Sequence, residues 1–226
     1  MPCPSAGTIP METIPETLRL ALQHHQAGRV QEAEALYRQI LQSKPDHPDA
    51  LHLLGVIAHH AGRHDAAIDY ISRAIGQNPN EALYHNNLGE TYRALGKSQE
   101  AAASYGRALA LKPDYAEAHY NLGVLLMGQG RAEAARACYQ KALAVNPDYA
   151  DALNNLGSAF LDQDKAEEAV ACYQRALTLK PDFVFAHNNL GNALAGQGRL
   201  VEAVAHFRQA LALQPACAEV YNNLGN

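Results

Sequence analysis

The feature that most constrains the fold of this chain is a period of 34 residues. Prolines stand at Pro45, Pro79, Pro113, Pro147, Pro181 and Pro215, each 34 residues after the one before. Glycines follow the same period at Gly55, Gly89, Gly123, Gly157, Gly191 and Gly225. A second glycine series runs through Gly28, Gly62, Gly96, Gly130 and Gly198, with Asp164 in its one gap. Three series with one period indicate internal repeats, in which one structural unit recurs and packs on its neighbours.

The period divides the chain into six complete units when each proline is given position 32. These units are 14–47, 48–81, 82–115, 116–149, 150–183 and 184–217, and residues 218–226 begin a seventh unit that stops at its ninth residue. Residues 1–13 are predicted to form a flexible tail, because the opening MPCPSAGTIPMETIPET is rich in proline and small residues. The opening also lacks the basic and apolar runs of a secretory signal.

Each unit reads as two helices with two breaks. Positions 1–14 are predicted to form the first helix, which the glycine at position 15 ends because glycine adopts a left-handed conformation at little cost. Positions 18–31 are predicted to form the second helix, which the proline at position 32 ends because proline cannot continue the hydrogen-bonding pattern.

Small and large residues alternate so that the helices can pack closely. Position 8 is glycine in units two to seven, and position 20 is alanine in all six complete units. Position 24 carries a large residue in every complete unit: Tyr37, Ile71, Tyr105, Tyr139, Tyr173 and Phe207. One unit cannot bury such an apolar stripe alone, so stacked units must cover it. We therefore predict an all-α solenoid of stacked helix pairs.

These positions resemble the tetratricopeptide repeat (TPR), in six complete copies over residues 14–217. The pattern of a small residue at positions 8 and 20, an aromatic residue at 24, alanine at 27 and proline at 32 is matched nearly throughout. The chain departs from it at position 4, where the usual aromatic residue is replaced by Leu51, His85, His119, Leu153 and His187. The resemblance implies a right-handed superhelical solenoid, in which first helices line a concave groove that binds protein or peptide.

Asparagines recur at two positions expected to face that groove. Position 6 holds Asn87, Asn121, Asn155, Asn189 and Asn223, and position 5 holds Asn86, Asn154, Asn188 and Asn222, with Tyr120 as the exception. An asparagine amide offers the donor and the acceptor needed to hold a peptide unit of an extended chain. We expect these residues to bind an extended polypeptide, with position 6 on a face that packs against nothing within the array. The alternative interpretation is that asparagine at these positions only follows the repeat consensus.

An uninterrupted asparagine ladder is similar to that of protein O-linked N-acetylglucosamine transferases. The segments LALQHHQAGRVQEAEALYRQIL and HPDALHLLGVIAHHAGRHDAAI resemble the bacterial SPINDLY-like members. That resemblance implies a substrate-targeting role beside a separate transferase domain downstream. None of that domain is present in these 226 residues, so we predict no catalytic residue and no enzyme activity for this chain.

Composition argues against several other partners. The formal net charge is −5, with 18 Lys and Arg against 23 Asp and Glu, so the chain lacks the basic surface that nucleic acid requires. No apolar run is long enough to span a membrane, and a cytoplasmic location is expected. A carboxylate clamp is also disfavoured, because positions 2 and 5 of units two to seven carry no Lys or Arg.

Histidines and cysteines give no strong sign of a metal or cofactor. His60 and His64 are four residues apart, but Gly62 breaks the helix between them. The usual ligand cluster with two cysteines or a carboxylate is absent, so no metal and no cofactor are predicted. Cys138 and Cys172 occupy position 23 of adjacent units, whose helices are expected about 8–10 Å apart, too far for a disulfide. Both are expected to be partly buried thiols.

A second functional class competes with peptide binding. The chain could be a scaffold that associates with copies of itself, with no peptide in the groove. Because unit seven stops within its first helix, its apolar Tyr221 and Leu224 would meet water, and two copies could form a homodimer through these ends. We expect the protein to continue past Asn226.

Overall fold

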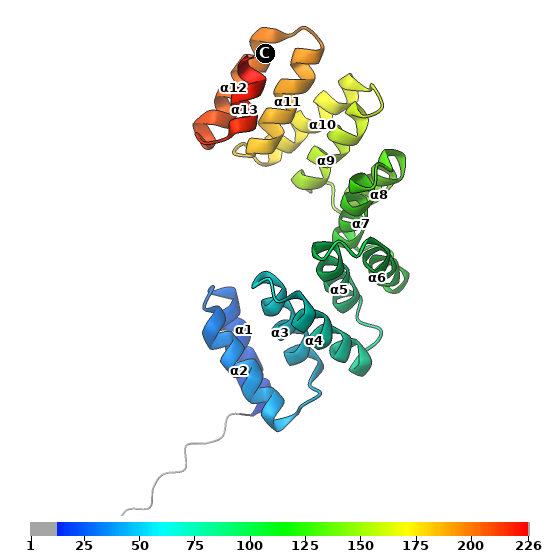
Figure 1. Ribbon diagram of the computed structural model, residues 1–226, viewed down its shortest axis with the longest axis vertical. Helices are drawn as coiled ribbons and strands as arrows, with labels where there is room; N and C mark the ends of the chain where they lie inside the picture. The colour runs from blue at the N-terminus through cyan, green and yellow to red at the C-terminus, as the bar shows by residue number, and fades with distance from the viewer. Residues whose placement is uncertain (1–12, 226) are drawn as a thin grey trace, which may run out of the picture. The chain divides into compact units, whose positions relative to one another are not determined.

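The computed structural model describes residues 13–225. The predicted N-terminal tail, apart from its last residue Thr13, and the final Asn226 lie outside the described residues. The described chain is all α-helix with no strand and forms 13 helices in consecutive packed pairs (Figure 1). The predicted fold class is therefore confirmed.

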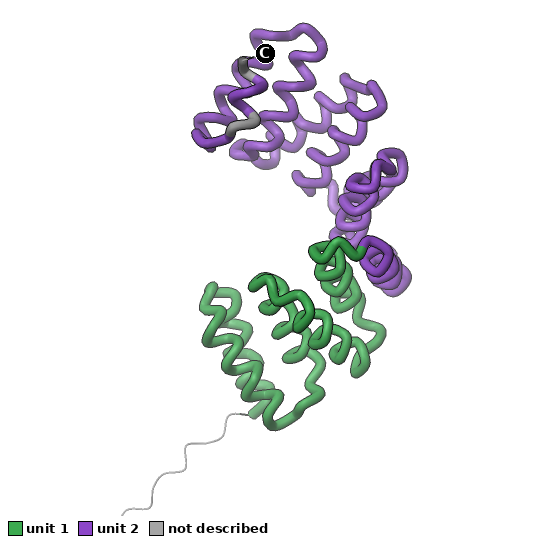
Figure 2. The backbone as a smooth tube through the Cα atoms, in the orientation of Figure 1, with its two compact units in different colours: residues 1–97 green, residues 98–226 purple. Residues whose placement is uncertain are grey.

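The chain forms two compact units, residues 1–97 and residues 98–226 (Figure 2). The first unit contains α1 (Ile14–Gln26), α2 (Val30–Ser43), α3 (Pro48–His60), α4 (His64–Gln77) and α5 (Ala82–Ala94). The second unit contains α6 (Ser98–Leu111), α7 (Ala116–Gly128), α8 (Ala132–Val145), α9 (Ala150–Leu161), α10 (Ala166–Leu179), α11 (Val184–Gly196), α12 (Leu200–Leu213) and α13 (Ala218–Gly225). Within each unit, every helix packs on the next one along the chain.

The turn inside each helix pair has a left-handed residue, as the glycine series predicts. Gly28, Gly62, Gly96, Gly130 and Gly198 have φ angles of 71° to 75°. Asp164, which fills the gap in the series, also has a positive φ of 58°. Aspartate is one of the few residues that tolerates this region, so the fifth turn keeps its geometry without glycine. The second helices begin and end one residue earlier than predicted.

In the helix pairs α3–α4, α7–α8, α9–α10 and α11–α12, a large residue of the second helix packs on a glycine of the first. Tyr37, Tyr105, Tyr139 and Tyr173 have no more than 1% of their surface exposed. A Cβ atom placed on Gly157 would lie 2.6 Å from Cε1 of Tyr173, and one on Gly123 would lie 2.6 Å from Cε1 of Tyr139. The ring therefore fills the space that the missing side chain leaves, which is why position 8 is small where position 24 is aromatic.

The carbonyl groups of the repeat prolines accept hydrogen bonds from two kinds of side chain. His85, His119 and His187 lie 2.9, 2.9 and 3.0 Å, through Nε2, from the carbonyl oxygens of Pro79, Pro113 and Pro181. In the repeats where position 4 is leucine, an arginine of the second helix donates this hydrogen bond instead. Arg73 donates to Pro45 at 3.0 Å and Arg175 donates to Pro147 at 2.7 Å. A histidine in place of the usual aromatic residue at position 4 thus supplies a hydrogen-bond donor for the connecting loop.

Candidate functional site

The predicted asparagines lie on the first helices of the pairs. Asn86 and Asn87 belong to α5 in the first unit. In the second unit, Tyr120 and Asn121 lie on α7, Asn154 and Asn155 on α9, Asn188 and Asn189 on α11, and Asn222 and Asn223 on α13. Within that unit α9 contacts both α7 and α11, so their asparagines lie on neighbouring helices. Within each unit, we call the surface made by positions 2, 5 and 6 of its first helices the first-helix face of that unit.

The asparagines bind one another from repeat to repeat. For four of the five asparagines at position 6, the amide donates to the position-5 side chain of the repeat before it, 35 residues earlier. The distances from Nδ2 are 2.8 Å for Asn87 to His52 Nε2, 3.3 Å for Asn155 to Tyr120 Oη, 3.0 Å for Asn189 to Asn154 Oδ1, and 2.9 Å for Asn223 to Asn188 Oδ1. The same hydrogen bond thus joins neighbouring first helices within both units. Its acceptor at position 5 is histidine, tyrosine or asparagine.

A second bond within one helix extends these links into a chain. Asn154 Nδ2 donates to Asn155 Oδ1 at 3.1 Å. Hydrogen bonds therefore run without a break from Asn189 to Asn154, then to Asn155, and finally to Tyr120. We call this series across α11, α9 and α7 the amide chain. It fixes the orientation of each amide group, because every donor in the series faces an acceptor.

Burial separates the two asparagine positions. Asn86, Asn154 and Asn188 at position 5 are 0%, 6% and 3% exposed. At position 6, Asn87, Asn155, Asn189 and Asn223 are half-buried, whereas Asn121 is buried. The expectation that the position-6 face packs against nothing within the array is therefore wrong for Asn121, which is 5% exposed. Asn222 is exposed. Position 5 mainly joins the repeats, and most position-6 amides also reach the surface.

The half-buried amides keep hydrogen-bonding capacity beyond the amide chain. An asparagine side chain has two N–H donors and an oxygen with two lone pairs. The bond from Asn189 Nδ2 to Asn154 uses one of the two N–H groups. Such an arrangement can hold a ligand that offers both carbonyl oxygens and N–H groups, as an extended peptide backbone does.

His52 is a further member of this face that the sequence reasoning left out. It stands at position 5 of the second repeat, where other repeats carry asparagine, and is 4% exposed. Its Nε2 accepts the bond from Asn87, and its ring stacks on Tyr84 with centroids 4.4 Å apart. Burial lowers the pKa of His52 to about 4, and the nearby carboxylate of Asp49 only partly opposes this. Counting position 5 strictly by repeat would have found it.

The other histidines and the cysteines form no metal site among residues 13–225, where no group of three or more candidate ligands comes together. His59 lies between His60 and His64, with ring centroids 5.6 and 5.2 Å away. Burial, followed by the neighbouring histidines, lowers the pKa of His59. Cys138 and Cys172 are free, partly buried thiols, as predicted, and burial raises the pKa of Cys172 to about 11.

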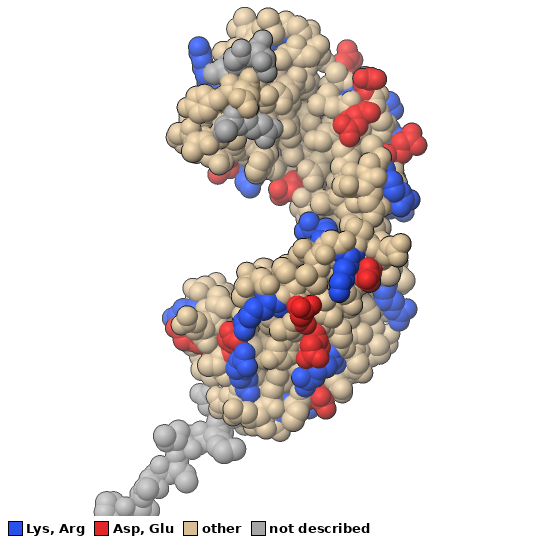
Figure 3. Space-filling view, viewed as in Figure 1, with Lys and Arg blue, Asp and Glu red and all other residues tan. Residues whose placement is uncertain are grey.

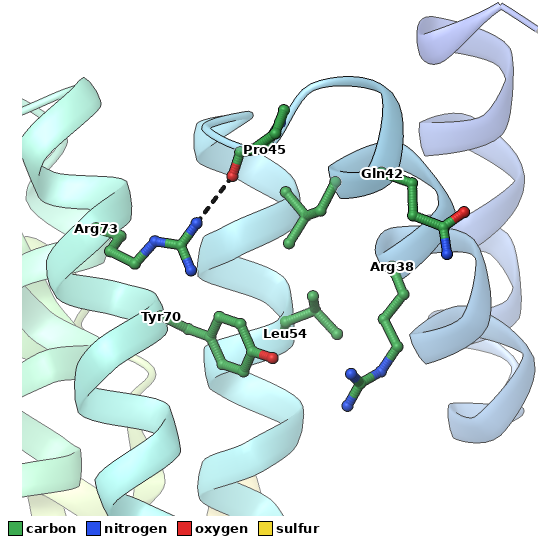
Figure 4. A pocket seen from close by; sticks show the side chains of 7 residues that line it. Arg38, Gln42, Pro45, Leu54, Tyr70 and Arg73 are labelled. Carbon is green, nitrogen blue, oxygen red and sulfur yellow. Dashed lines mark hydrogen bonds between the residues drawn. The ribbon is translucent and has the colours of Figure 1, made fainter.

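A separate pocket of about 330 Å³ opens between second helices in the first unit (Figure 4). It is lined by Arg38, Leu41, Gln42, Pro45, Leu54, Tyr70 and Arg73. Its two guanidinium groups already have acceptors: Arg38 binds Glu34 at 2.7 Å, and Arg73 binds the Pro45 carbonyl. Over α2 and α4, basic and acidic side chains alternate (Figure 3). The pocket therefore offers little uncompensated charge to an anion.

Comparison with known proteins identifies the repeat family. The family described as "Cilia and flagella-associated protein 70 C-terminal domain", a TPR family, matches residues 6–223. The chain belongs to this TPR family. None of the curated proteins matches the chain in sequence, and no finding supports a relationship to the SPINDLY-like transferases.

Solved structures resemble this TPR chain over most of its length. A chain of the APC/C hetero-tetramer Cut9-Hcn1 has a TM-score of 0.85 at 19% identity over 94% of this chain, which spans 42% of that one. MamA is 30% identical with a TM-score of 0.64, covering 74% of this chain and 97% of its own. YrrB, described as a TPR protein with an unusual peptide-binding site, has a TM-score of 0.66 at 16% identity, covering 84% of this chain and 98% of its own. These similarities support the TPR solenoid fold.

The TPR helices described here are short. No helix within residues 13–225 is both long enough and apolar enough to cross a membrane.

Proposed function

We propose that this TPR chain holds an extended polypeptide along the first-helix face of a unit through its position-6 asparagines. The observation that carries the proposal is the amide chain, because its half-buried members Asn155 and Asn189 are held in one orientation and still reach the surface. Oriented amides bind a peptide backbone without first losing rotational freedom. The TPR fold is typically non-catalytic, which agrees with a binding role.

The affinity must come from several position-6 asparagines acting together. One hydrogen bond contributes about 0.5–1.5 kcal/mol net, so a single asparagine cannot hold a ligand. An extended chain advances about 3.3 Å per residue, and neighbouring helices pack about 10 Å apart. A peptide would therefore meet one position-6 asparagine about every three residues. Binding through the backbone would be tolerant of sequence.

The test is selection from a random 12-residue peptide phage library, followed by titration of the selected peptides. We expect Asn155→Ala with Asn189→Ala to weaken binding at least about fivefold, because two hydrogen bonds contribute about 1–3 kcal/mol. Replacing one backbone N–H of the peptide by N-methyl should weaken binding as well, because it removes a donor. If selected peptides bind the double variant as tightly as the wild type, the position-6 asparagines do not hold the ligand.

The control must separate binding from stability, because both substitutions also remove bonds between repeats. Arg175→Ala provides a match: it removes one hydrogen bond to a preceding loop, from Arg175 to Pro147, on the second helix α10. We expect it to lower the melting temperature and to leave peptide affinity unchanged. A loss of affinity equal to that of the asparagine variants would assign their effect to stability alone.

A link to a glycosyltransferase-like protein is a finer part of the proposal. It is supported only by the resemblance of the asparagine ladder and of the two N-terminal segments to the SPINDLY-like members. Sequencing the coding region that follows Asn226 tests it. A sugar transferase domain there would support the link, and any other sequence would contradict it.

Self-association is the second candidate function, favoured by an exposed apolar pair at the start of α12. Leu200 and Val201 are 62% and 87% exposed, and adjacent apolar side chains of this kind are costly to leave in water. If this face joins two copies, the wild type should sediment as a dimer and Val201→Glu as a monomer. A wild type that sediments as a monomer at every concentration measured contradicts this candidate.

A further inference from the structure

The first-helix face of the second unit has a chemical pattern beside the amide chain. Position 2 precedes positions 5 and 6 by three and four residues, so its side chain lies next to theirs on the same helix face. Along α7, α9 and α11 position 2 is Glu117, Asp151 and Phe185. The side chains that flank the amide chain are therefore acidic, acidic and aromatic in that order.

The two carboxylates have no partner of their own within residues 13–225: neither Glu117 nor Asp151 makes a hydrogen bond or an ion pair there. The helices α7, α9 and α11 contain no Lys or Arg at all. Two nearby bases are turned toward rings, with Lys112 Nζ 5.2 Å from the ring centroid of Tyr115 and Lys180 Nζ 4.8 Å from that of Phe183. Within the described residues Glu117 and Asp151 are thus free of ion pairs, although Lys112 lines the same surface pocket as Glu117.

Phe185 adds an exposed aromatic ring to the same face. It is 61% exposed, although one edge meets the ring of Phe183 at a centroid distance of 6.4 Å and an angle of 90°. Asn188 and Asn189 lie one helical turn further along α11. An aromatic side chain left in water beside oriented amides is a typical contact for an apolar side chain of a bound peptide.

We propose that the polypeptide held by the second unit carries basic side chains that face Glu117 and Asp151 and an apolar or aromatic side chain that faces Phe185. This inference rests on the proposed function, since it assumes a peptide along the amide chain. At about three residues per repeat, the two basic residues and the apolar residue fall about three residues apart from one another. The asparagines hold the backbone, and position 2 selects the side chains.

The first unit provides an internal comparison, because its position 2 has a different chemistry. The carboxylate of Asp49 accepts the hydroxyl of Tyr84 at 2.6 Å, and the next position-2 residue is Leu83. Among the described residues of the first unit, Asp49 is thus the only carboxylate at position 2, and it already accepts a hydrogen bond. The basic preference therefore belongs to the second unit.

The probes are synthetic peptides about nine residues long, made of serine and glycine apart from three variable sites. One carries Lys, Lys and Phe at a spacing of three, a second replaces both lysines by Glu, and a third replaces Phe by Ser. Each is also made in reverse order, because a peptide can lie along the face in either direction. We expect the Lys-Lys-Phe peptide, in one of the two orders, to bind at least about tenfold more tightly than the other two, corresponding to about 1.4 kcal/mol.

The decisive measurement is a charge exchange. Asp151→Lys should weaken binding of the Lys-Lys-Phe peptide at least about tenfold and strengthen binding of the Glu-Glu-Phe peptide, because like charges repel and opposite charges attract. Phe185→Ala should remove the difference between the peptides with Phe and with Ser. Raising the salt concentration should weaken the lysine peptide and leave an uncharged one unchanged. Circular dichroism at each condition confirms that the variants remain folded.

The outcomes separate this inference from the proposed function. If all the probes bind with equal affinity to the wild type and to Asp151→Lys, the selection by position 2 is wrong. The proposed function still holds in that case if binding of the peptides depends on Asn155 and Asn189. If the lysine preference survives in Asp151→Lys and Glu117→Lys, another surface binds the peptide and the inference is overturned. If neither these probes nor a selected peptide binds, both fall.

Discussion

Gly157→Ala is expected to lower the free energy of unfolding by about 1–3 kcal/mol, the usual cost of forcing extra volume into a packed core. The new Cβ would lie 2.6 Å from Cε1, 2.8 Å from Cζ and 2.9 Å from Cδ1 of Tyr173. The Tyr173 ring is fully buried, so it cannot turn aside into solvent. The loss should appear in urea unfolding followed by circular dichroism.

Gly106→Ala is the matched control for this substitution. Gly106 lies inside α6, and a Cβ atom added there meets nothing within 4 Å. Alanine in a helix interior is favoured over glycine by about 0.5–1 kcal/mol, so this variant should become more stable. The two substitutions make the same chemical change with opposite expected signs. If Gly157→Ala is as stable as Gly106→Ala, the contact of Tyr173 with α9 is not as close as described.

The sequence was sufficient to predict the helix pairs because their main determinants are local and periodic. Glycine or proline at fixed positions ends a helix, and a small residue at position 8 matches a large one at position 24. Even the exception follows from local chemistry, since Asp164 occupies the left-handed turn with φ 58°. These features depend on one residue type at one repeat position, so counting by 34 reveals them.

The contacts between repeats were harder to predict. The asparagines were expected to face a ligand, yet Asn189 and Asn154 first bind each other across 35 residues. A single repeat shows no sign of this, because donor and acceptor lie in different repeats. The exchange between a position-4 histidine and a second-helix arginine for the proline carbonyl is of the same kind, as Arg175 and Pro147 are 28 residues apart. Whether the asparagines also bind a peptide stays a prediction.

Acid is expected to destabilise the chain through His52. Burial lowers the pKa of this side chain to about 4 in the folded protein, against about 6.5 in an unfolded chain. Below about pH 6.5 the unfolded state binds a proton that the folded state does not. The stability contributed by neutral His52 is therefore complete above about pH 6.5 and is lost as the pH falls toward 4. At 1.36 kcal/mol per pKa unit, the loss amounts to about 3 kcal/mol.

The structure gives a geometric reason for the neutral form. Nε2 of His52 accepts a hydrogen bond from the Asn87 amide at 2.8 Å, and a protonated ring would have no lone pair there to accept it. His52→Asn tests this, because an asparagine at position 5 can accept the same bond through Oδ1, as Asn154 does from Asn189. The variant should keep the inter-repeat bond and lose the titrating group.

The measurement is the free energy of unfolding by urea between about pH 7 and pH 4 for both proteins. We expect the wild type to lose about 3 kcal/mol more than His52→Asn across this range. Carboxylates with lowered pKa values, such as Glu34, also reduce stability as the pH falls, but they are present in both proteins and cancel in the difference. Loss of the ring stacking with Tyr84 should lower the variant's stability by about 0.5–1.5 kcal/mol at every pH. The change of the unfolding free energy with pH therefore tests the prediction, and its value at one pH does not. Equal slopes, or an NMR titration of the His52 ring with a pKa near 6.5, would show that His52 is protonated as readily in the folded chain as in the unfolded one.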